Sequence, residues 1–181
     1  MRNKVRIIGG EWRSRVLTFP DHTDLRPTPD RVRETVFNWL GQDMRTKRCL
    51  DLFAGSGAMG FEAASRGAAE VVMVESNREV LQALKANLQK LGARQIDLVG
   101  MDAAKFIDSD RRRFDVIFLD PPYRLGLLPG LLPKLHSHLT VEGLVYLENE
   151  RPFEPGVDWL IWRKSEAGRA HYQLLKSVVN G

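Results

Sequence analysis

Short apolar runs alternate with longer amphipathic stretches between residues 49 and 149. Runs rich in Val, Leu, Ile and Phe predict buried strands at residues 49–55, 70–75, 96–100, 114–120 and 143–149. Apolar residues at helical spacing predict helices between them, at residues 58–67, 76–92, 103–107 and 127–139. Ser76 is the predicted N-cap of the second of these helices. Repeated strand–helix units of this kind predict a doubly wound α/β fold, Rossmann-like, with a mostly parallel sheet covered on both faces.

The C-terminal part departs from this alternation. Residues 159–164 and 170–175 are apolar stretches that flank a turn containing Gly168. This pattern is typical of a β-hairpin, because glycine suits the tight turn. We therefore expect the hairpin to add an antiparallel edge to the sheet.

The segment before residue 49 predicts a small extension and not another strand–helix unit. Short strands are expected at residues 4–8 and 15–19, around the turn residues Gly9 and Gly10. We therefore divide the chain into an N-terminal extension, residues 1–48, and a core, residues 49–181.

A helix is expected to end this extension, in the stretch "LRPTPDRVRETVFNWL" of residues 25–40. Thr28 is its predicted N-cap, and Pro29 suits the first helical position. Val32, Val36, Phe37 and Leu40 form one apolar stripe, so Arg31 and Arg33 are expected nearer the other side of the helix.

The positive charge of the chain is concentrated in the extension. Residues 1–48 hold 11 Lys and Arg against 6 Asp and Glu, and the remaining residues hold 16 against 17. Such an excess is typical of a surface that binds a polyanion, although a solvated basic face gives the same count.

Composition is that of a soluble globular protein, with 43% hydrophobic and 28% charged residues. There is no apolar run of membrane length and no signal peptide, and Cys49 is the single cysteine. We therefore expect a cytoplasmic protein without a disulfide. His136 and His138 lack further metal ligands at suitable spacing, so we expect no metal site there.

A glycine-rich loop, Gly55-Ser56-Gly57-Ala58-Met59-Gly60, joins the first core strand to the first core helix. It matches the G-x-G-x-x-G pattern of nucleotide-binding proteins, and Glu75 ends the next strand, where it is expected to bind a ribose diol. The pattern alone does not separate S-adenosylmethionine (SAM) from NAD, or from a structural loop.

Asp51, which precedes this loop, favours SAM. A carboxylate there repels the pyrophosphate of a dinucleotide, whereas SAM carries an ammonium and a sulfonium. Asp102 follows the third core strand and is expected at the same edge of the sheet, where it can accept from an adenine amine or cap the following helix.

The stretch "FLDPPY" ends the fourth core strand. Pro121 and Pro122 restrict the backbone next to Asp120, so its carboxylate is held at the strand end beside Tyr123. Stacking on Tyr123 would fix the plane of a nucleobase, for which the ring is needed and not the hydroxyl, and Asp120 would accept from its exocyclic amine. A Pro-Pro turn with a solvent-facing tyrosine is the structural alternative.

The stretches "DLFAGSGAMGFEAASRGA" and "DPPY" resemble class I SAM-dependent methyltransferases that modify amino groups. Together with "RIIGGEWRSRVL" and "LRPTPDRVRETVFNWL", in this order, they are similar to the bacterial 16S rRNA guanine-N2 methyltransferases that act on guanine 966. The resemblance implies a seven-stranded sheet with its last strand antiparallel, and an N-terminal extension that contacts RNA. One departure is Ser14, where we expect a glycine between Arg13 and Arg15.

The resemblance also implies site residues, named here by position in this chain. SAM, with S-adenosylhomocysteine as product, is expected on Asp51, Phe53, Ala54, Gly55, Ser56, Gly57, Glu75, Ser76, Asp102 and Ala103. The target amine is expected at Asp120, Pro121, Pro122 and Tyr123. RNA contacts are expected from Arg6, Arg13, Arg15, Arg26, Arg31 and Arg33.

The expected activity is therefore methyl transfer to the N2 amine of a guanine in 16S rRNA. The expected partner is the 30S subunit or an assembly intermediate, and we expect a monomer without membrane contact. A DNA adenine-N6 or cytosine-N4 methyltransferase uses the same amine chemistry. Such an enzyme also needs a module that reads the DNA sequence, and only about 48 residues of this chain lie outside the predicted core. A protein-amide methyltransferase and a non-catalytic nucleic-acid-binding module remain as further alternatives.

Overall fold

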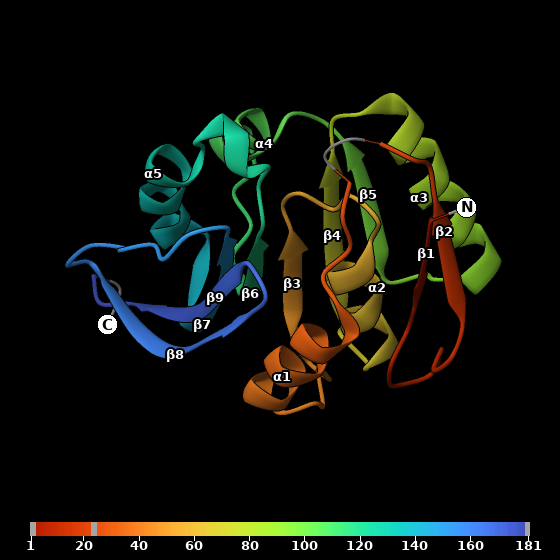
Figure 1. Ribbon diagram of the computed structural model, residues 1–181, viewed down its shortest axis with the longest axis horizontal. Helices are drawn as coiled ribbons and strands as arrows, with labels where there is room; N and C mark the ends of the chain where they lie inside the picture. Colours follow the sequence, from red (N-terminus) through yellow and green to blue (C-terminus); the bar gives the residue numbers. More distant parts are fainter. Residues whose placement is uncertain (1–2, 23–24, 180–181) are drawn as a thin grey trace.

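A seven-stranded sheet in the spatial order β5-β4-β3-β6-β7-β9-β8 forms the centre of the protein (Figure 1). The computed structural model describes residues 3–22 and 25–179. The strands are β3 (Arg48–Asp51), β4 (Glu70–Glu75), β5 (Ile96–Gly100), β6 (Phe114–Leu119), β7 (Leu139–Asn149), β8 (Trp159–Ala167) and β9 (Ala170–Ser177). Strands β3 to β7 pair in parallel, which confirms the doubly wound fold.

The antiparallel strand lies inside the sheet and not at its edge. β9 pairs antiparallel with both β7 and β8, so β8 is the outer strand. Four consecutive residues of β9, Tyr172–Leu175, are buried, whereas most of β8 is exposed. A strand buried on both faces belongs inside a sheet, which explains why the second arm of the hairpin takes the inner place.

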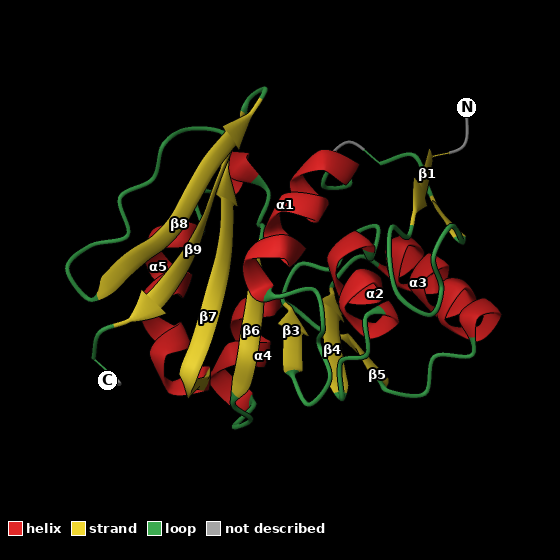
Figure 2. Cartoon of the chain, turned by 90° about the horizontal axis from the view of Figure 1, so that it is seen from below, coloured by secondary structure: helices red, strands yellow, loops and turns green. Residues whose placement is uncertain are grey.

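Helices cover both faces of this sheet (Figure 2). α1 (Asp30–Leu40), α2 (Ala58–Ser65) and α3 (Arg78–Leu91) pack in one hydrophobic cluster. α4 (Ala103–Ser109), α5 (Leu128–Leu131) and the 3-10 helix η2 (Leu132–His138) pack in the cluster on the other side. Within residues 3–22 and 25–179, no helix has the length and apolar content needed to cross a membrane.

The helix starts confirm one capping prediction and correct two. Asp102 caps α4 by accepting from the Lys105 N–H at 3.1 Å, as expected. α3 is capped by Asn77 and not by Ser76, since the Asn77 side chain accepts from the third helical N–H. α1 starts at Asp30 without a side-chain cap, because the Thr28 hydroxyl is directed to a carboxylate on β7.

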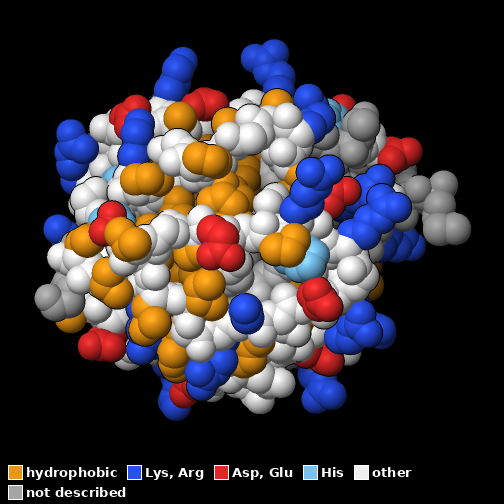
Figure 3. Space-filling view, turned by 60° about the vertical axis from the view of Figure 1, so that its left-hand side comes forward, with side chains coloured by type: hydrophobic (Ala, Val, Ile, Leu, Met, Phe, Trp, Pro, Cys, Tyr) orange, Lys and Arg blue, Asp and Glu red, His pale blue; other side chains and the backbone are white. Residues whose placement is uncertain are grey.

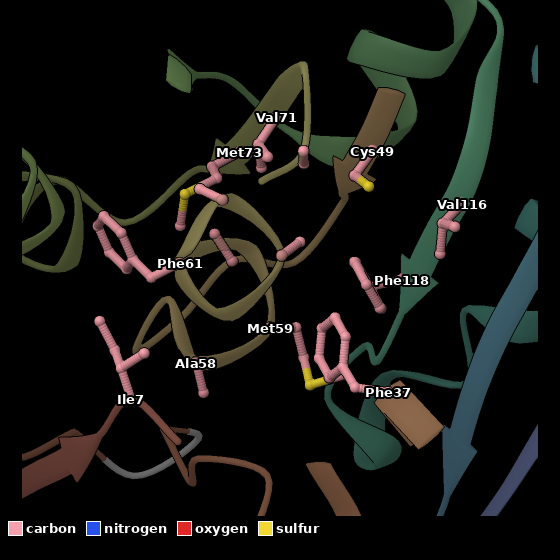
Figure 4. Packing of buried hydrophobic residues seen from close by; sticks show 14 of the residues in the cluster. Ile7, Phe37, Cys49, Ala58, Met59, Phe61, Val71, Met73, Val116 and Phe118 are labelled. Carbon is pink, nitrogen blue, oxygen red and sulfur yellow. The ribbon is translucent and has the colours of Figure 1, made fainter. Parts of the chain in front are cut away.

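The N-terminal extension consists of the antiparallel strands β1 (Asn3–Arg6) and β2 (Val16–Phe19), followed by α1. It packs into the same core as the sheet. Ile7 and Phe37, both from the extension, lie in one cluster with Phe61 of α2 and Phe118 of β6 (Figure 4). The division at residue 48 is therefore a hypothesis about function, since the two parts share a continuous apolar core.

Buried Glu62 of α2 holds this extension in place. Its carboxylate accepts from the backbone N–H groups of Ile8 and Gly9, both at 2.9 Å. It also pairs with the guanidinium groups of Arg33, at 3.0 Å, and Arg66, at 2.9 Å. A buried carboxylate requires such partners, so Glu62 links α1, α2 and the β1–β2 turn.

Arg33 is a correction to the predicted RNA contacts. Its side chain is 1% exposed, and it pairs with Glu62 and Asp30 and donates to the carbonyl oxygens of Arg6 and Thr28. A guanidinium with these partners has no surface for a phosphate, so Arg33 stabilises the fold.

Ser14 adopts the backbone conformation that glycine prefers, with a φ of 71°. Its N–H donates to the Ile7 carbonyl at 2.8 Å, which closes the β1–β2 turn. The turn therefore keeps its left-handed shape despite the serine, at a cost of about 1 kcal/mol for a side chain in this region.

Candidate functional site

A row of acidic residues marks the carboxyl ends of five neighbouring strands. In the spatial order β5, β4, β3, β6 and β7 these are Asp102, Glu75, Asp51, Asp120 and Glu148. The first four were predicted as site residues, whereas Glu148 was not. The parallel sheet places these acids along one edge, and such an edge favours a cationic ligand over a phosphate.

The glycine loop folds tightly between β3 and α2. Gly55 and Gly57 have φ values of 52° and 84°, and the Gly57 N–H donates to the Ala54 carbonyl at 2.8 Å. A Cβ at Gly57 would lie 2.4 Å from the Phe61 ring, so only glycine fits there. The loop therefore turns tightly into the start of α2, beside the row of acids.

Asp51 is buried beneath this loop, with 3% of its surface exposed. It accepts from the Gly60 N–H at 3.0 Å, and a Cβ at Gly60 would lie only 3.1 Å from the same oxygen. Burial raises the pKa of Asp51 to about 7; the hydrogen bond from Gly60 acts in the opposite direction, and the charge of Glu75 adds to the rise. A positive ligand nearby would therefore favour the ionised carboxylate.

Glu75 ends β4 and already anchors the loop. One of its oxygens accepts from the Gly55 N–H at 3.0 Å, and the other accepts from the Asn77 N–H at 2.9 Å. Each carboxylate oxygen keeps a further lone pair, so Glu75 can still accept from a diol.

The remaining predicted cofactor residues lie around these acids. Ser56, Ala54 and Ala103 are buried, and Phe53 packs against the cluster on the α4 side. Ser76 is exposed directly after β4. The structure thus brings all predicted cofactor residues to one edge of the sheet.

The Asp-Pro-Pro-Tyr stretch leaves β6 and enters a 3-10 turn, η1 (Tyr123–Leu125). Pro121 is buried and Asp120 is partly buried. Burial, followed by the charges of Glu148 and Asp51, raises the pKa of Asp120 well above its usual value. Asp120 therefore lies near Asp51, with a carboxyl that binds a proton more readily than a free aspartate does.

The Tyr123 side chain is 39% exposed, and its hydroxyl donates to Glu148 at 3.1 Å. The expectation that only the ring matters is therefore revised, since the hydroxyl has a structural partner. Glu148 carried no motif signal; the sequence shows it only as a charged residue near the end of an otherwise apolar strand.

Two described residues between β2 and α1, His22 and Leu25, lie at the same edge of the sheet. Leu25 lies over the glycine loop, so that a Cβ at Gly55 would come within 2.9 Å of its side chain. His22 contacts Asn77 at the start of α3, with 3.3 Å between their side-chain nitrogens. The sequence gave no sign that Leu25 would lie over the glycine loop.

The predicted RNA-contacting arginines are spread over the extension. Arg6, Arg13, Arg15, Arg26 and Arg31 are exposed. Arg26 follows Leu25, which lies over the glycine loop, whereas Arg13 and Arg15 lie on the β1–β2 turn, which packs on Ser65 at the far end of α2. On the face in Figure 3, hydrophobic and acidic side chains cross the middle and most lysines and arginines stand toward the margin.

A hollow of about 740 Å³ lies at that far end, between the β1–β2 turn, α1 and the end of α2. Its lining includes Arg13, Arg45 and Arg66, but also Glu34 and Asp43. It contains none of the acids of the strand ends, so it is separate from the predicted site.

The two histidines considered as a metal pair have other partners. His138 is buried and contacts the carbonyl oxygens of Ile107 and Arg112 at 2.9 and 3.2 Å, and His136 stacks on Trp159 at 4.0 Å. Among the described residues, no group of three or more His, Cys, Asp or Glu is arranged to hold a metal ion.

The model of the family described as conserved hypothetical protein 95 matches residues 5–176. Among curated proteins, the ribosomal RNA small subunit methyltransferase D of Escherichia coli K12 is 42% identical, over 98% of this chain and 92% of the relative. The protein of the same name from Haemophilus influenzae is 37% identical, over 97% and 95%.

Solved structures of methyltransferases have the same fold as this chain. The methyltransferase yhhF of Escherichia coli superposes with a TM-score of 0.87 at 41% identity, covering 97% of this chain and 98% of that structure. A methylase from Haemophilus influenzae gives a TM-score of 0.80 at 34% identity, covering 97% and 99%. The chain therefore belongs to the 16S rRNA methyltransferase family of the ribosomal RNA small subunit methyltransferase D proteins.

Proposed function

We propose that this protein transfers a methyl group from SAM to the exocyclic N2 amine of a guanine in 16S rRNA. The observation that carries the proposal is the arrangement at the ends of β3 and β6. There the buried Asp51, beneath the glycine loop, and Asp120, beside Tyr123, end neighbouring strands. This arrangement provides for a cationic cofactor on one side and for a planar amine on the other.

The residues present fit SAM. Asp51, Glu75 and Asp102 lie at the strand ends around the glycine loop, and a dinucleotide phosphate placed there would meet their negative charges. Glu75 keeps lone pairs for the ribose diol, and Asp102 stands at the end of β5 for the adenine amine. SAM, when bound, supplies a methyl group on a sulfonium and leaves as S-adenosylhomocysteine.

Asp120 and Tyr123 orient the amine in this proposal. The Tyr123 ring offers an exposed face on which a base can stack, an interaction of about 1–3 kcal/mol. Asp120 accepts from the N2 amine and takes up the proton that the amine loses once its nitrogen carries the methyl group. Alignment of the nitrogen with the methyl group is the larger contribution, because the sulfonium is already reactive.

The RNA must reach an acidic crevice, so its phosphates have to stay outside. An extruded or looped-out guanine satisfies this requirement, because the base carries no charge. Arg26 lies beside the crevice, and Arg6, Arg13, Arg15 and Arg31 are exposed on the extension. We propose that these arginines hold flanking phosphates, that the substrate is the 30S subunit or an assembly intermediate, and that the protein acts as a monomer.

Calorimetry tests the cofactor. SAM and S-adenosylhomocysteine are expected to bind, and NADH to bind more weakly than either. Tighter binding of NADH would contradict the proposal in favour of a dinucleotide site.

Tritium-labelled SAM tests the substrate when offered with 16S rRNA, 30S particles, 23S rRNA and duplex DNA. Label is expected in the first or second of these and absent from the others. Preferred labelling of duplex DNA would instead indicate the related DNA amino methyltransferase activity.

A further inference from the structure

Glu148 is a buried carboxylate, 5% exposed, near the end of β7. Three hydroxyl groups donate to it. The Tyr123 hydroxyl reaches one oxygen at 3.1 Å, and the hydroxyls of Tyr146 and Thr28 reach the other at 2.9 and 3.4 Å. These donors come from the turn after β6, from β7 itself and from the segment before α1.

In all three contacts Glu148 is the hydrogen-bond acceptor. Hydroxyl donors stabilise a buried carboxylate without neutralising its charge, and an acid that donated its own proton would leave one of these hydroxyls misdirected. Burial and the charges of Asp120 and Glu148 raise the pKa of Tyr123, so its hydroxyl keeps the proton that it donates.

Asp120 lies against the same carboxylate. After burial, the charge of Glu148 is the main cause of the raised pKa of Asp120, followed by the charge of Asp51. A neighbouring negative charge makes a carboxyl bind its proton more tightly, so the charge state of Asp120 depends on Glu148.

Glu148 thus touches both residues that the proposed reaction places on the target base. We propose that Glu148 is a positioning residue for methyl transfer, which fixes the Tyr123 ring through its hydroxyl and orients the Asp120 carboxyl. This inference rests on the proposed function. It also explains why a largely apolar strand carries a buried acid, since a hydrophobic residue there would leave the Tyr123 and Tyr146 hydroxyls without this acceptor.

The first test uses Glu148→Gln, Tyr123→Phe and the double variant, with 30S particles and 16S rRNA as substrates. Each single change is expected to lower kcat about tenfold to hundredfold, the value of one hydrogen bond to a charged group, while SAM affinity stays within about twofold. The double variant is expected to lose no more activity than the more impaired of the two single variants, because both changes act on the same hydrogen bond: Tyr123→Phe removes its donor and Glu148→Gln removes the charge of its acceptor. Losses that multiply in the double variant would overturn the inference.

The second test does not depend on activity. Carbon-13 NMR of the aspartate carboxyl groups, assigned with Asp120→Asn, follows the titration of Asp120. The other titratable groups facing it are Asp51 on β3, Tyr123 on the turn, and Tyr146 and Glu148 on β7. Glu148→Gln is expected to move the Asp120 midpoint to lower pH, and Tyr123→Phe, which keeps the charge of Glu148, is expected to move it less.

An unchanged Asp120 midpoint in Glu148→Gln would overturn the inference whatever the substrate is. Absence of methylation by the wild-type protein would instead count against the proposed function. If Glu148→Gln does not fold, Tyr123→Phe still tests the hydrogen bond, because it changes only the partly exposed donor. A kcat of Tyr123→Phe equal to that of the wild type would overturn the inference.

Discussion

Replacing Asp51 with asparagine isolates the charge of the buried carboxyl beneath the glycine loop. The amide oxygen of asparagine can still accept from the Gly60 N–H, which lies 3.0 Å from Asp51 in the wild type. The change therefore removes a titrating group and leaves the packing almost intact.

The raised pKa of Asp51 determines whether stability rises or falls with pH. Asp51 titrates near 3.8 in the unfolded chain and at about 7 in the folded protein. Between these values the folded state binds the proton more tightly, so stability falls as pH rises from about 4 to about 7. At 1.36 kcal/mol per unit, the loss between pH 5 and pH 8 is about 3 kcal/mol, an upper value because water and structural relaxation reduce it.

Urea unfolding of the wild type and of Asp51→Asn at pH 5 and pH 8 measures this effect. The stability of the variant relative to the wild type is expected to increase by about 1–3 kcal/mol from pH 5 to pH 8. Asp102→Asn is the control, because Asp102 is exposed and asparagine is also a good helix cap. Its difference from the wild type is expected to stay the same at both pH values.

The affinity for SAM depends on the same charge, but it is expected to rise with pH where stability falls. A cationic ligand favours ionised Asp51, so wild-type affinity is expected to rise with pH by up to about tenfold per unit below pH 7. Asp51→Asn is expected to bind SAM more weakly at pH 8 and with less pH dependence. If Asp51→Asn differs from the wild type by the same amount at pH 5 and at pH 8, both in stability and in SAM affinity, Asp51 does not titrate in this range and the electrostatic reasoning is wrong.

Three further predictions concern the extension. Ser14→Gly is expected to stabilise the protein by about 0.5–1 kcal/mol in thermal unfolding, because Ser14 has positive φ; a loss of stability would contradict this. Arg33→Ala is expected to lower the free energy of unfolding by about 3 kcal/mol, because it leaves buried Glu62 with one ion-pair partner fewer. Arg31→Ala, at an exposed position of the same helix, is expected to change it by no more than about 0.5 kcal/mol, and equal effects of the two changes in urea unfolding would refute the structural role of Arg33. Arg13→Ala together with Arg15→Ala is expected to raise the KM for RNA and flatten its salt dependence without changing SAM affinity, and unchanged kinetics at every salt concentration would show that the turn is a solvated basic face.

Local signals in the sequence were sufficient for the central sheet and the glycine loop. Apolar runs between turn residues predicted β3 to β7, and the G-x-G-x-x-G pattern predicted the loop in which Gly55 and Gly57 have positive φ. The cap at Asp102 was predicted for the same reason, because it depends on residues only three positions apart.

Contacts between distant segments were beyond this reading. Arg33 was expected on the surface, since periodicity did not reveal that Glu62, 29 residues away, would bury it. Thr28 was expected to cap α1, but its hydroxyl faces Glu148, 120 residues away. Such pairings depend on which elements the tertiary fold places together, so neither helical period nor capping preference could predict them.

The inner position of β9 is an intermediate case. The hairpin was visible in the sequence, and the apolar stretch "YQLL" indicates burial on both faces. Choosing which arm pairs with β7 required comparing this stretch with the more polar β8, and not only recognising the turn at Gly168.

The most direct test of the proposed function is the identity of the methylated nucleoside. Wild-type protein and Asp120→Ala are incubated with SAM and with 30S particles or 16S rRNA, and the RNA is digested to nucleosides and analysed by mass spectrometry. The proposal predicts N2-methylguanosine from the wild type and its loss in Asp120→Ala, with SAM affinity retained in the variant. A methyl group on adenine or cytosine, or full activity of Asp120→Ala, would contradict the assignment of the guanine amine to Asp120.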